Sequence, residues 1–152
     1  RNTYLENSLK VPGKLTVAGE KVDLSSIDAP AFIYGSREDH IVPWGAAYAS
    51  TALLNPKKPK ANRFILGASG HIAGLINPAS KNRRSYWVSN STASVPEEWL
   101  ETATEEKGSW WLHWIEWLKP RSGSMIAARN KPGNAKYKVL EAAPGRYVKE
   151  KA

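Results

Sequence analysis

The fold of this chain is decided by two short apolar runs, Ala31-Phe32-Ile33-Tyr34-Gly35 and Arg63-Phe64-Ile65-Leu66-Gly67. Each run has the length of a strand and stops at a glycine, a pattern typical of a β-strand buried on both faces. Residues 45–54 between them are rich in alanine, and their apolar side chains recur at close to helical spacing. This strand, helix, strand pattern predicts one βαβ unit with parallel strands, and therefore an α/β fold.

The segments that flank this unit have weaker patterns. Residues 15–24 alternate apolar and polar side chains around Gly19, which predicts a short hairpin. Lysines and prolines dominate residues 55–61 and predict a loop. Residues 96–118 are expected to be helical with one break, and the chain beyond Pro120 is expected to be a basic, irregular extension.

Composition narrows the classes of protein to which the chain can belong. The 152 residues are 41% hydrophobic and include seven tryptophans, so the chain can bury a core and wholesale disorder is not expected. The sequence has no cysteine, which excludes a disulfide scaffold and a zinc–thiolate site within it. No apolar run approaches the roughly 18 residues that a transmembrane helix needs, so no transmembrane segment is expected.

The formal net charge of +8 is distributed unevenly. Residues 55–84 carry seven basic and no acidic side chains, residues 119–152 carry nine and two, and residues 85–118 carry one and six. Because this acidic, tryptophan-rich block interrupts the basic regions, a continuous surface for nucleic acid is not indicated. Two interpretations remain open: solvated loops with a basic tail, or local attraction for an anionic partner such as a phosphorylated cofactor.

Two chemically suited side chains follow the two predicted strands. Asp39 lies four residues after Gly35, and His71 lies four residues after Gly67. Functional groups of open parallel sheets gather outside the carboxyl ends of the strands, so this carboxylate and imidazole are expected at one edge. There the imidazole would act as a general base, and the carboxylate would fix its tautomer. An acid followed by a histidine also matches the residue order of α/β-hydrolases.

The nucleophile of such a triad is expected on a G-x-S-x-G turn, or a cysteine variant of it, before the acid. The serines that precede Asp39 lack the flanking glycines, and no cysteine is present. Either the pair is not catalytic, or its nucleophile lies upstream of Arg1. The chain begins at Arg1 and its one methionine is Met125, which favours an upstream nucleophile and predicts that these residues alone are inactive.

Four motifs make the sequence similar to a known family. They are Ser-Arg-Glu-Asp-His-Ile-Val-Pro-Trp at residues 36–44, Leu-Gly-Ala-Ser-Gly-His-Ile-Ala-Gly at 66–74, Gly-Ser-Trp-Trp at 108–111 and Pro-Gly-Arg-Tyr-Val-Lys at 144–149. These motifs closely resemble the C-terminal part of polyhydroxyalkanoate synthases, and most closely the class I enzymes that form poly(3-hydroxybutyrate). The resemblance runs over essentially the whole chain.

The resemblance implies the C-terminal portion of an α/β-hydrolase fold, which carries the last parallel strands with flanking helices and an irregular C-terminal extension. Residues 1–118 would belong to the catalytic domain, and residues 119–152 would be a basic extension that packs on it. It further implies a Cys-His-Asp triad in which Asp39 is the acid, His71 is the base and His40 supports the site. The cysteine would lie upstream of the chain.

The implied activity is that of an acyltransferase that polymerises (R)-3-hydroxyacyl-coenzyme A, with 3-hydroxybutyryl-coenzyme A as the expected substrate. Coenzyme A is part of the substrate and product, so neither a cofactor nor a metal is expected. The base that deprotonates the incoming 3-hydroxyl would be His71 or Asp39. In the ordinary triad Asp39 only orients His71, so a direct role of Asp39 is the less expected alternative. The resemblance also implies a cytoplasmic enzyme at polyester granules, a homodimer when complete, whose partners are its substrate, its growing polyester and its own N-terminal part.

Two other classes of function stay open from the residues themselves. An esterase or polyester depolymerase of the same fold would use the same triad with water as the acceptor. A basic, non-enzymatic binding module would use the net charge of +8. The tryptophans at 110, 111, 114 and 117 are expected to pack in the core, with a face for polymer or protein as the alternative.

Overall fold

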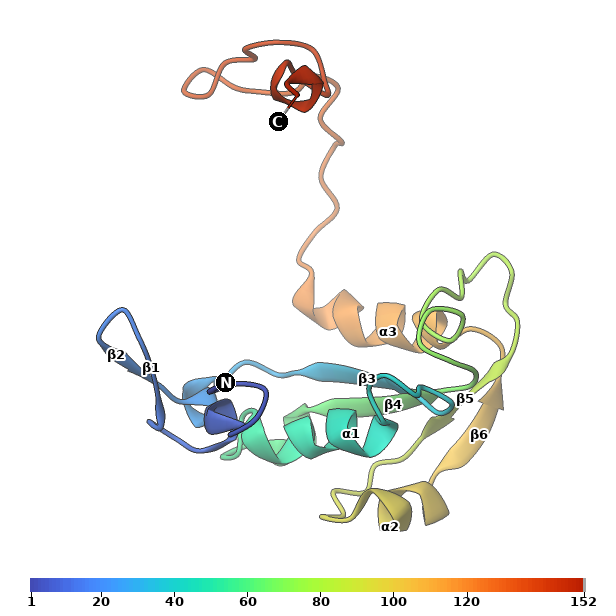
Figure 1. The fold of residues 1–152 in the computed structure, drawn as a ribbon. Helices are drawn as coiled ribbons and strands as arrows, with labels where there is room; N and C mark the ends of the chain where they lie inside the picture. Colours follow the sequence, from blue (N-terminus) through green and yellow to red (C-terminus); the bar gives the residue numbers. More distant parts are fainter. Residues whose placement is uncertain (152) are drawn as a thin grey trace. The chain divides into compact units, whose positions relative to one another are not determined.

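The computed structural model describes residues 1–151, which form two compact units, Arg1–Arg121 and a second unit that starts at Ser122. The first unit contains a four-stranded sheet in the order β3-β4-β5-β6. Helix α3 covers one face of this sheet, and α1 and α2 lie on the other face (Figure 1). The predicted α/β class is therefore confirmed.

The βαβ unit predicted from the two apolar runs is present. Strand β3 (Phe32–Ser36) pairs in parallel with β4 (Arg63–Gly67), in a register that sets Phe32 opposite Arg63. Helix α1 (Trp44–Leu53) connects them and ends where Asn55 adopts a left-handed φ of 47°. A proline follows Asn55 and cannot continue a helix, so the lysine-rich segment forms the predicted loop.

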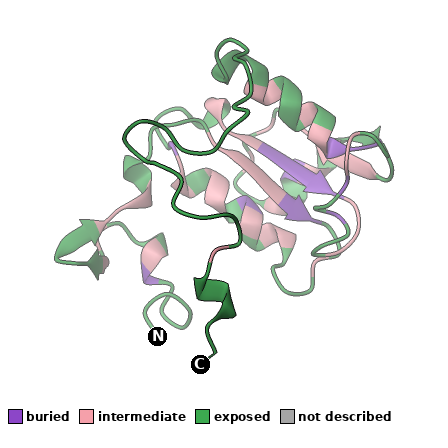
Figure 2. Cartoon of the chain, turned by 90° about the horizontal axis from the view of Figure 1, so that it is seen from above, coloured by how far each residue is buried: buried purple, intermediate pink, exposed green. Residues whose placement is uncertain are grey.

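The two parallel strands differ in how deeply they are buried. Residues 64–67 of β4 are buried, as expected for a strand with neighbours on both sides. Strand β3 lies at the end of the sheet among the described strands, and its first three residues are only half-buried (Figure 2). The prediction of a strand buried on both faces is therefore correct for β4 and wrong for most of β3.

The rest of the sheet differs from the prediction. Strand β5 (Ser85–Val88) was not expected, although its Tyr-Trp-Val sequence has high strand propensity. Residues 96–118 form α2 (Pro96–Glu101), strand β6 (Thr104–Lys107) and α3 (Trp110–Leu118), so the expected helical stretch is wrong in its middle. The Thr-Glu-Glu-Lys sequence of β6 is a strand because it pairs with β5, and both β4–β5 and β5–β6 are antiparallel.

Two small regions complete the secondary structure. The predicted hairpin is confirmed as β1 (Leu15–Val17) paired antiparallel with β2 (Glu20–Val22). Single 3₁₀ turns lie at Ser8–Lys10, Leu24–Ser26, Pro59–Ala61, Lys119–Arg121 and Tyr147–Lys149. Across residues 1–151, no helix combines the length and apolar character needed to cross a bilayer.

The core of the first unit is aromatic on both faces of the sheet. On the α1 face, Phe64 packs edge-to-face against Tyr48 and Trp99, with ring centroids 4.9 Å apart in each pair. On the α3 face, Trp110 stacks on Tyr34 at 4.5 Å. The expected packing role of the tryptophans is thus met at Trp110, which is 7% exposed, whereas Trp114 on the same helix is 37% exposed.

The second unit is irregular, as predicted for a Gly- and Pro-rich basic segment. Its described part contains a single short element, the 3₁₀ turn Tyr147–Lys149. Its packing on residues 1–118 stays a prediction.

Candidate active site

Asp39 is held by its own loop. This loop leaves the carboxyl end of β3, and its amide at Asp39 donates to the carbonyl of Ser36 at 3.2 Å. The side chain then turns back, and Oδ1 accepts hydrogen bonds from the backbone amides of Ile41 and Val42, each at 2.9 Å. An aspartate that accepts hydrogen bonds from the next amides in this way is a local feature, which depends only on the residues near it in sequence. The other carboxylate oxygen, Oδ2, remains for a partner outside the loop.

That partner is His71, whose Nδ1 lies 2.7 Å from Asp39 Oδ2. The two loops are also joined through their main chains, because Glu38 N donates to Ser69 O at 3.1 Å and Arg37 N donates to Gly67 O at 2.8 Å. The predicted meeting of this carboxylate and imidazole at one sheet edge is therefore present in the structure. Their catalytic role stays a prediction.

The pKa of Asp39 indicates which of the two side chains carries the proton of their hydrogen bond. The amide of Val42 is the main influence that lowers the pKa of Asp39, to about 2; burial opposes it, and hydrogen bonds from His71 and Ile41 add to it. The carboxyl group is thus ionised at neutral pH and can only accept a hydrogen bond. The proton between the two side chains therefore sits on Nδ1 of His71, which leaves Nε2 free as a proton acceptor. The Asp39 side chain is 8% exposed and that of His71 is 46% exposed, so the imidazole is accessible.

The loop that carries His71 is held by helix α3. The indole N–H of Trp110 donates to the carbonyl of Gly74 at 3.2 Å, and that of Trp111 donates to the carbonyl of Leu75 at 3.0 Å. These carbonyls lie three and four residues after His71. The sequence had indicated only packing for these tryptophans, because no local pattern shows which carbonyl an indole will reach.

Tyr34 lies beneath both loops. Its hydroxyl is 3.0 Å from Ser36 Oγ, and burial raises its pKa above the ordinary value. A Cβ atom at Gly67 or Gly74 would overlap this hydroxyl, so the close approach of the His71 loop requires glycine at both positions. Sequence reasoning missed Tyr34 as a site residue, because no local pattern shows which loops its hydroxyl will approach.

The remaining predicted site features have different outcomes. His40 is exposed, and no hydrogen bond or ion pair joins it to Asp39 or His71 in the described residues, so its supporting role stays a prediction. No serine or threonine within residues 1–121 is hydrogen-bonded to His71. The described part of the chain contains no cluster of three or more His, Asp or Glu side chains suited to a metal ion.

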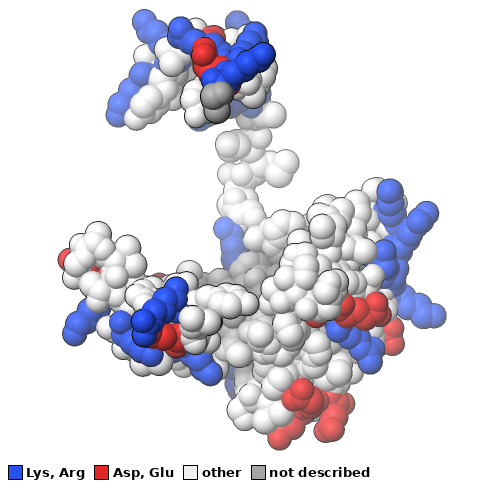
Figure 3. Space-filling view, in the orientation of Figure 1, with Lys and Arg blue, Asp and Glu red and all other residues white. Residues whose placement is uncertain are grey.

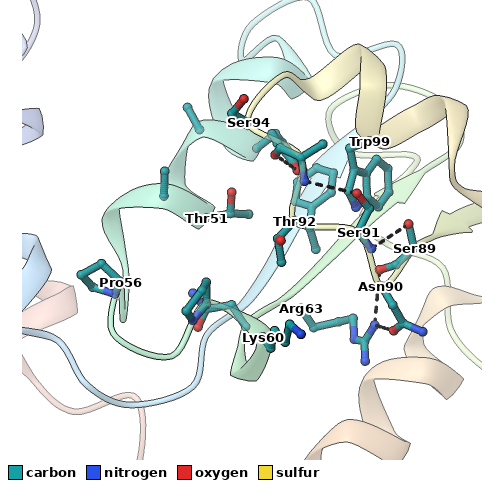
Figure 4. A pocket seen from close by; sticks show the side chains of 17 residues that line it. Thr51, Pro56, Lys60, Arg63, Ser89, Asn90, Ser91, Thr92, Ser94 and Trp99 are labelled. Carbon is teal, nitrogen blue, oxygen red and sulfur yellow. Dashed lines mark hydrogen bonds between the residues drawn. The ribbon is translucent and has the colours of Figure 1, made fainter.

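A cavity of about 630 Å³ lies elsewhere in the first unit (Figure 4). It is bounded by the end of α1, the loop before β4 and residues 89–94, and Arg63, the first residue of β4, lines it. His71 follows the last residue of β4, so cavity and pair are at opposite ends of this strand. Neither Asp39 nor His71 lines this cavity.

Comparison with known proteins shows which enzymes have a sequence similar to that of this chain. No protein-family model matches the chain. The chain is 60% identical over all 152 residues to the poly(3-hydroxyalkanoate) polymerase subunit PhaC of Cupriavidus necator. It is 40% identical over 142 residues to poly(3-hydroxyalkanoate) polymerase 2 of Ectopseudomonas oleovorans, and 36% identical over 151 residues to the PhaC subunit of Rhizobium etli.

These matches cover nearly all of this chain but only a small part of each relative. They cover 93–100% of this chain but only 23–25% of each relative, so the chain spans about a quarter of the length of the curated proteins that it matches. A match of this identity along the whole chain establishes common ancestry. Along its whole length the chain is therefore similar to about one quarter of a poly(3-hydroxyalkanoate) polymerase.

Proposed function

We propose that this chain is the part of a poly(3-hydroxyalkanoate) polymerase that supplies the acid and the base of the active site. The observation that carries the proposal is the 2.7 Å hydrogen bond between Asp39 and His71, beyond the carboxyl ends of two parallel strands. The names of the relatives support polymerisation over hydrolysis as the reaction. The order of strand, acid, helix, strand and histidine supports an α/β-hydrolase fold for the complete domain.

The chemistry would begin with a cysteine thiol that lies outside this chain. His71 Nε2 accepts the thiol proton, and the thiolate attacks the thioester carbonyl of an (R)-3-hydroxyacyl-coenzyme A such as 3-hydroxybutyryl-coenzyme A. The bond between the carbonyl carbon and the sulfur of coenzyme A breaks, and the coenzyme A thiolate takes the proton from the imidazolium. The acyl group is then held on the enzyme as a new thioester.

Chain growth needs a second proton transfer. The 3-hydroxyl of another acyl group gives its proton to His71, and its oxygen attacks the enzyme thioester to form an ester bond. The cysteine sulfur leaves with the electron pair of the broken bond and regains the proton. Throughout, Asp39 holds the Nδ1–H of His71 and stabilises the imidazolium.

The geometry favours His71 over Asp39 as the base that activates the hydroxyl. Asp39 has a pKa of about 2, and its two oxygens already accept hydrogen bonds from Ile41, Val42 and His71. A carboxylate with so low a pKa is a weak proton acceptor at neutral pH. Nε2 of His71 is accessible and makes no hydrogen bond to Asp39, so it is in a position to accept the proton of the hydroxyl.

The partners and location belong to the same proposal. The substrate is the acyl-coenzyme A, the product is the polyester, and the remaining three quarters of the enzyme supply the nucleophile. By its resemblance to class I synthases, the complete enzyme is proposed to be a cytoplasmic homodimer bound to polyester granules. Sedimentation of the complete polymerase and microscopy of a fluorescent fusion would test these two assignments.

Substitution within a complete polymerase that carries this chain tests the proposal. We expect His71→Ala and Asp39→Asn each to reduce polymer formation strongly, by at least about a hundredfold for His71, because the proton acceptor or its orientation is lost. Release of coenzyme A from 3-hydroxybutyryl-coenzyme A would be measured, with circular dichroism to verify folding. Lys57→Gln, in the loop after α1, provides a control. Rates near that of the control for both variants would overturn the proposal.

A further inference from the structure

Three cationic side chains lie in the loop that joins β4 to β5. Lys81, Arg83 and Arg84 are all exposed, and Figure 3 shows lysine and arginine side chains gathered over this part of the molecule. Residues 40–96 contain no aspartate or glutamate. None of the ion pairs in the described residues includes these three side chains. Their charge is therefore not compensated within the described chain.

This loop returns to the sheet at the edge where Asp39 and His71 meet. Directly after Arg84, the carbonyl of Ser85 accepts a hydrogen bond from the amide of Ala68, the residue that follows the end of β4, at 3.0 Å. Burial raises the pKa of Tyr34; the hydrogen bond from Ser36 and the charge of Arg84 lower it, and the charge of Asp39 raises it. Arg84 and Asp39 thus both act electrostatically on the hydroxyl beneath the His71 loop.

The main chain of the basic loop is fixed while its charged side chains remain free. Asn77, a buried residue, donates from Nδ2 to the carbonyl of Arg83 at 2.7 Å. The amide of Gly108 donates to the carbonyl of Arg84 at 2.8 Å. Arg84 itself has a backbone φ of 70°, a conformation that a residue with a Cβ atom adopts at an energetic cost. The backbone of the loop is therefore anchored at both Arg83 and Arg84.

We propose that Lys81, Arg83 and Arg84 form the subsite that binds the phosphate groups of the acyl-coenzyme A substrate. The inference rests on the proposed function, because it assigns a binding role at that same active site. The acyl chain and the polyester are uncharged, so the phosphates are the anionic groups that this substrate offers. Guanidinium and ammonium groups bind phosphate through charge-assisted hydrogen bonds.

The test compares two substrates with the same reacting group in the complete polymerase. The first is 3-hydroxybutyryl-coenzyme A, and the second is the 3-hydroxybutyryl thioester of pantetheine, which lacks phosphate. The variant combines Lys81→Gln, Arg83→Gln and Arg84→Asn, because asparagine tolerates the positive φ at that position. The control combines Lys57→Gln, Lys58→Gln and Lys60→Gln, which removes the same charge from the loop before β4.

We expect the triple variant to raise KM for the coenzyme A thioester by at least about tenfold, with kcat changed by less than about twofold. KM for the pantetheine thioester should not change, and the difference between enzymes should shrink as ionic strength rises. Adenosine 3′,5′-bisphosphate should compete with the coenzyme A thioester in the wild type and compete more weakly in the variant. The control should leave both KM values unchanged.

Three outcomes would overturn the inference. One is an equal change of KM for both thioesters, which would indicate a structural role for the loop. Another is an equal effect of the control variant, which would indicate a general effect of net charge. The third is an unchanged KM for the coenzyme A thioester in the triple variant and in Arg83→Gln alone, which guards against poor folding of the triple variant. Failure of the wild type to release coenzyme A would instead contradict the proposed function.

Discussion

The two loops that bring Asp39 and His71 together are held in different ways. Asp39 is fixed by the amides of Ile41 and Val42, which are two and three residues away. The loop of His71 is fixed by indole groups of Trp110 and Trp111, which are 36 residues from the carbonyls that they bind. One half of the pair is therefore organised locally, and the other half depends on the docking of α3. The next three predictions test this difference.

The largest effect is expected from Gly74→Ala, because the new methyl group would overlap the carbonyl of Ala68 and the hydroxyls of Ser36 and Tyr34. We expect the free energy of unfolding to fall by about 1–3 kcal/mol. Gly45→Ala in α1 is the matched control, since its Cβ would meet Pro96 at an ordinary 3.5 Å and a helical alanine is favourable. Urea unfolding would measure both. An equal loss for the two variants would contradict tight packing of the His71 loop.

A smaller effect is expected from Trp110→Phe, which keeps an aromatic ring but leaves the buried carbonyl of Gly74 without its donor. The free energy of unfolding should fall by about 1–2 kcal/mol, and amide exchange of residues 70–75 should accelerate. The loop of residues 37–43 should keep its exchange rates if it is held locally. Trp114→Phe, one turn further along α3 and 37% exposed, is the control. Equal acceleration in both loops would show that they form one unit.

The smallest effect concerns pH. The pKa of Asp39 is about 2 in the folded chain, below its ordinary value of 3.8, so its ionised form stabilises the fold. This contribution is fully present above pH 4 and is lost as the pH falls from about 4 towards 2. We expect Asp39→Asn to remove that part of the acid dependence of stability, measured by urea unfolding at several pH values. A carboxyl titration near pH 4 in NMR spectra would refute the local organisation of this loop.

The success of the sequence predictions follows the same division. The strands at 32–36 and 63–67, the helix between them and the loop of Asp39 depend on residues close in sequence, so periodicity and turn chemistry predicted them. The meeting of Asp39 with His71 was also predictable, because parallel strands bring their carboxyl ends to one edge. Strand β6 was not predictable, since Thr-Glu-Glu-Lys has no strand pattern and pairs only because β5 has an open edge.

The charge distribution shows the same limit. Residues 55–84 formed one basic stretch in the sequence, with two possible interpretations. In the structure, β4 separates its two clusters, so Lys57, Lys58 and Lys60 lie before the strand and Lys81, Arg83 and Arg84 lie after it. Only the second cluster lies at the same end of β4 as Asp39 and His71. The order of residues along the chain does not show this spatial separation of the two clusters.

The sequence by itself determined the α/β class, the parallel strand pair, the candidate acid and base, and the resemblance to the poly(3-hydroxyalkanoate) polymerases. Each of these depends on short-range periodicity, on local hydrogen bonding or on residue identity along the chain. Only the tertiary structure decided which donors hold the His71 loop, which strand lies at the edge and which basic cluster lies at the same end of the sheet as Asp39 and His71. These features come from contacts between segments tens of residues apart, whose geometry is set by the packing of the whole sheet and its helices.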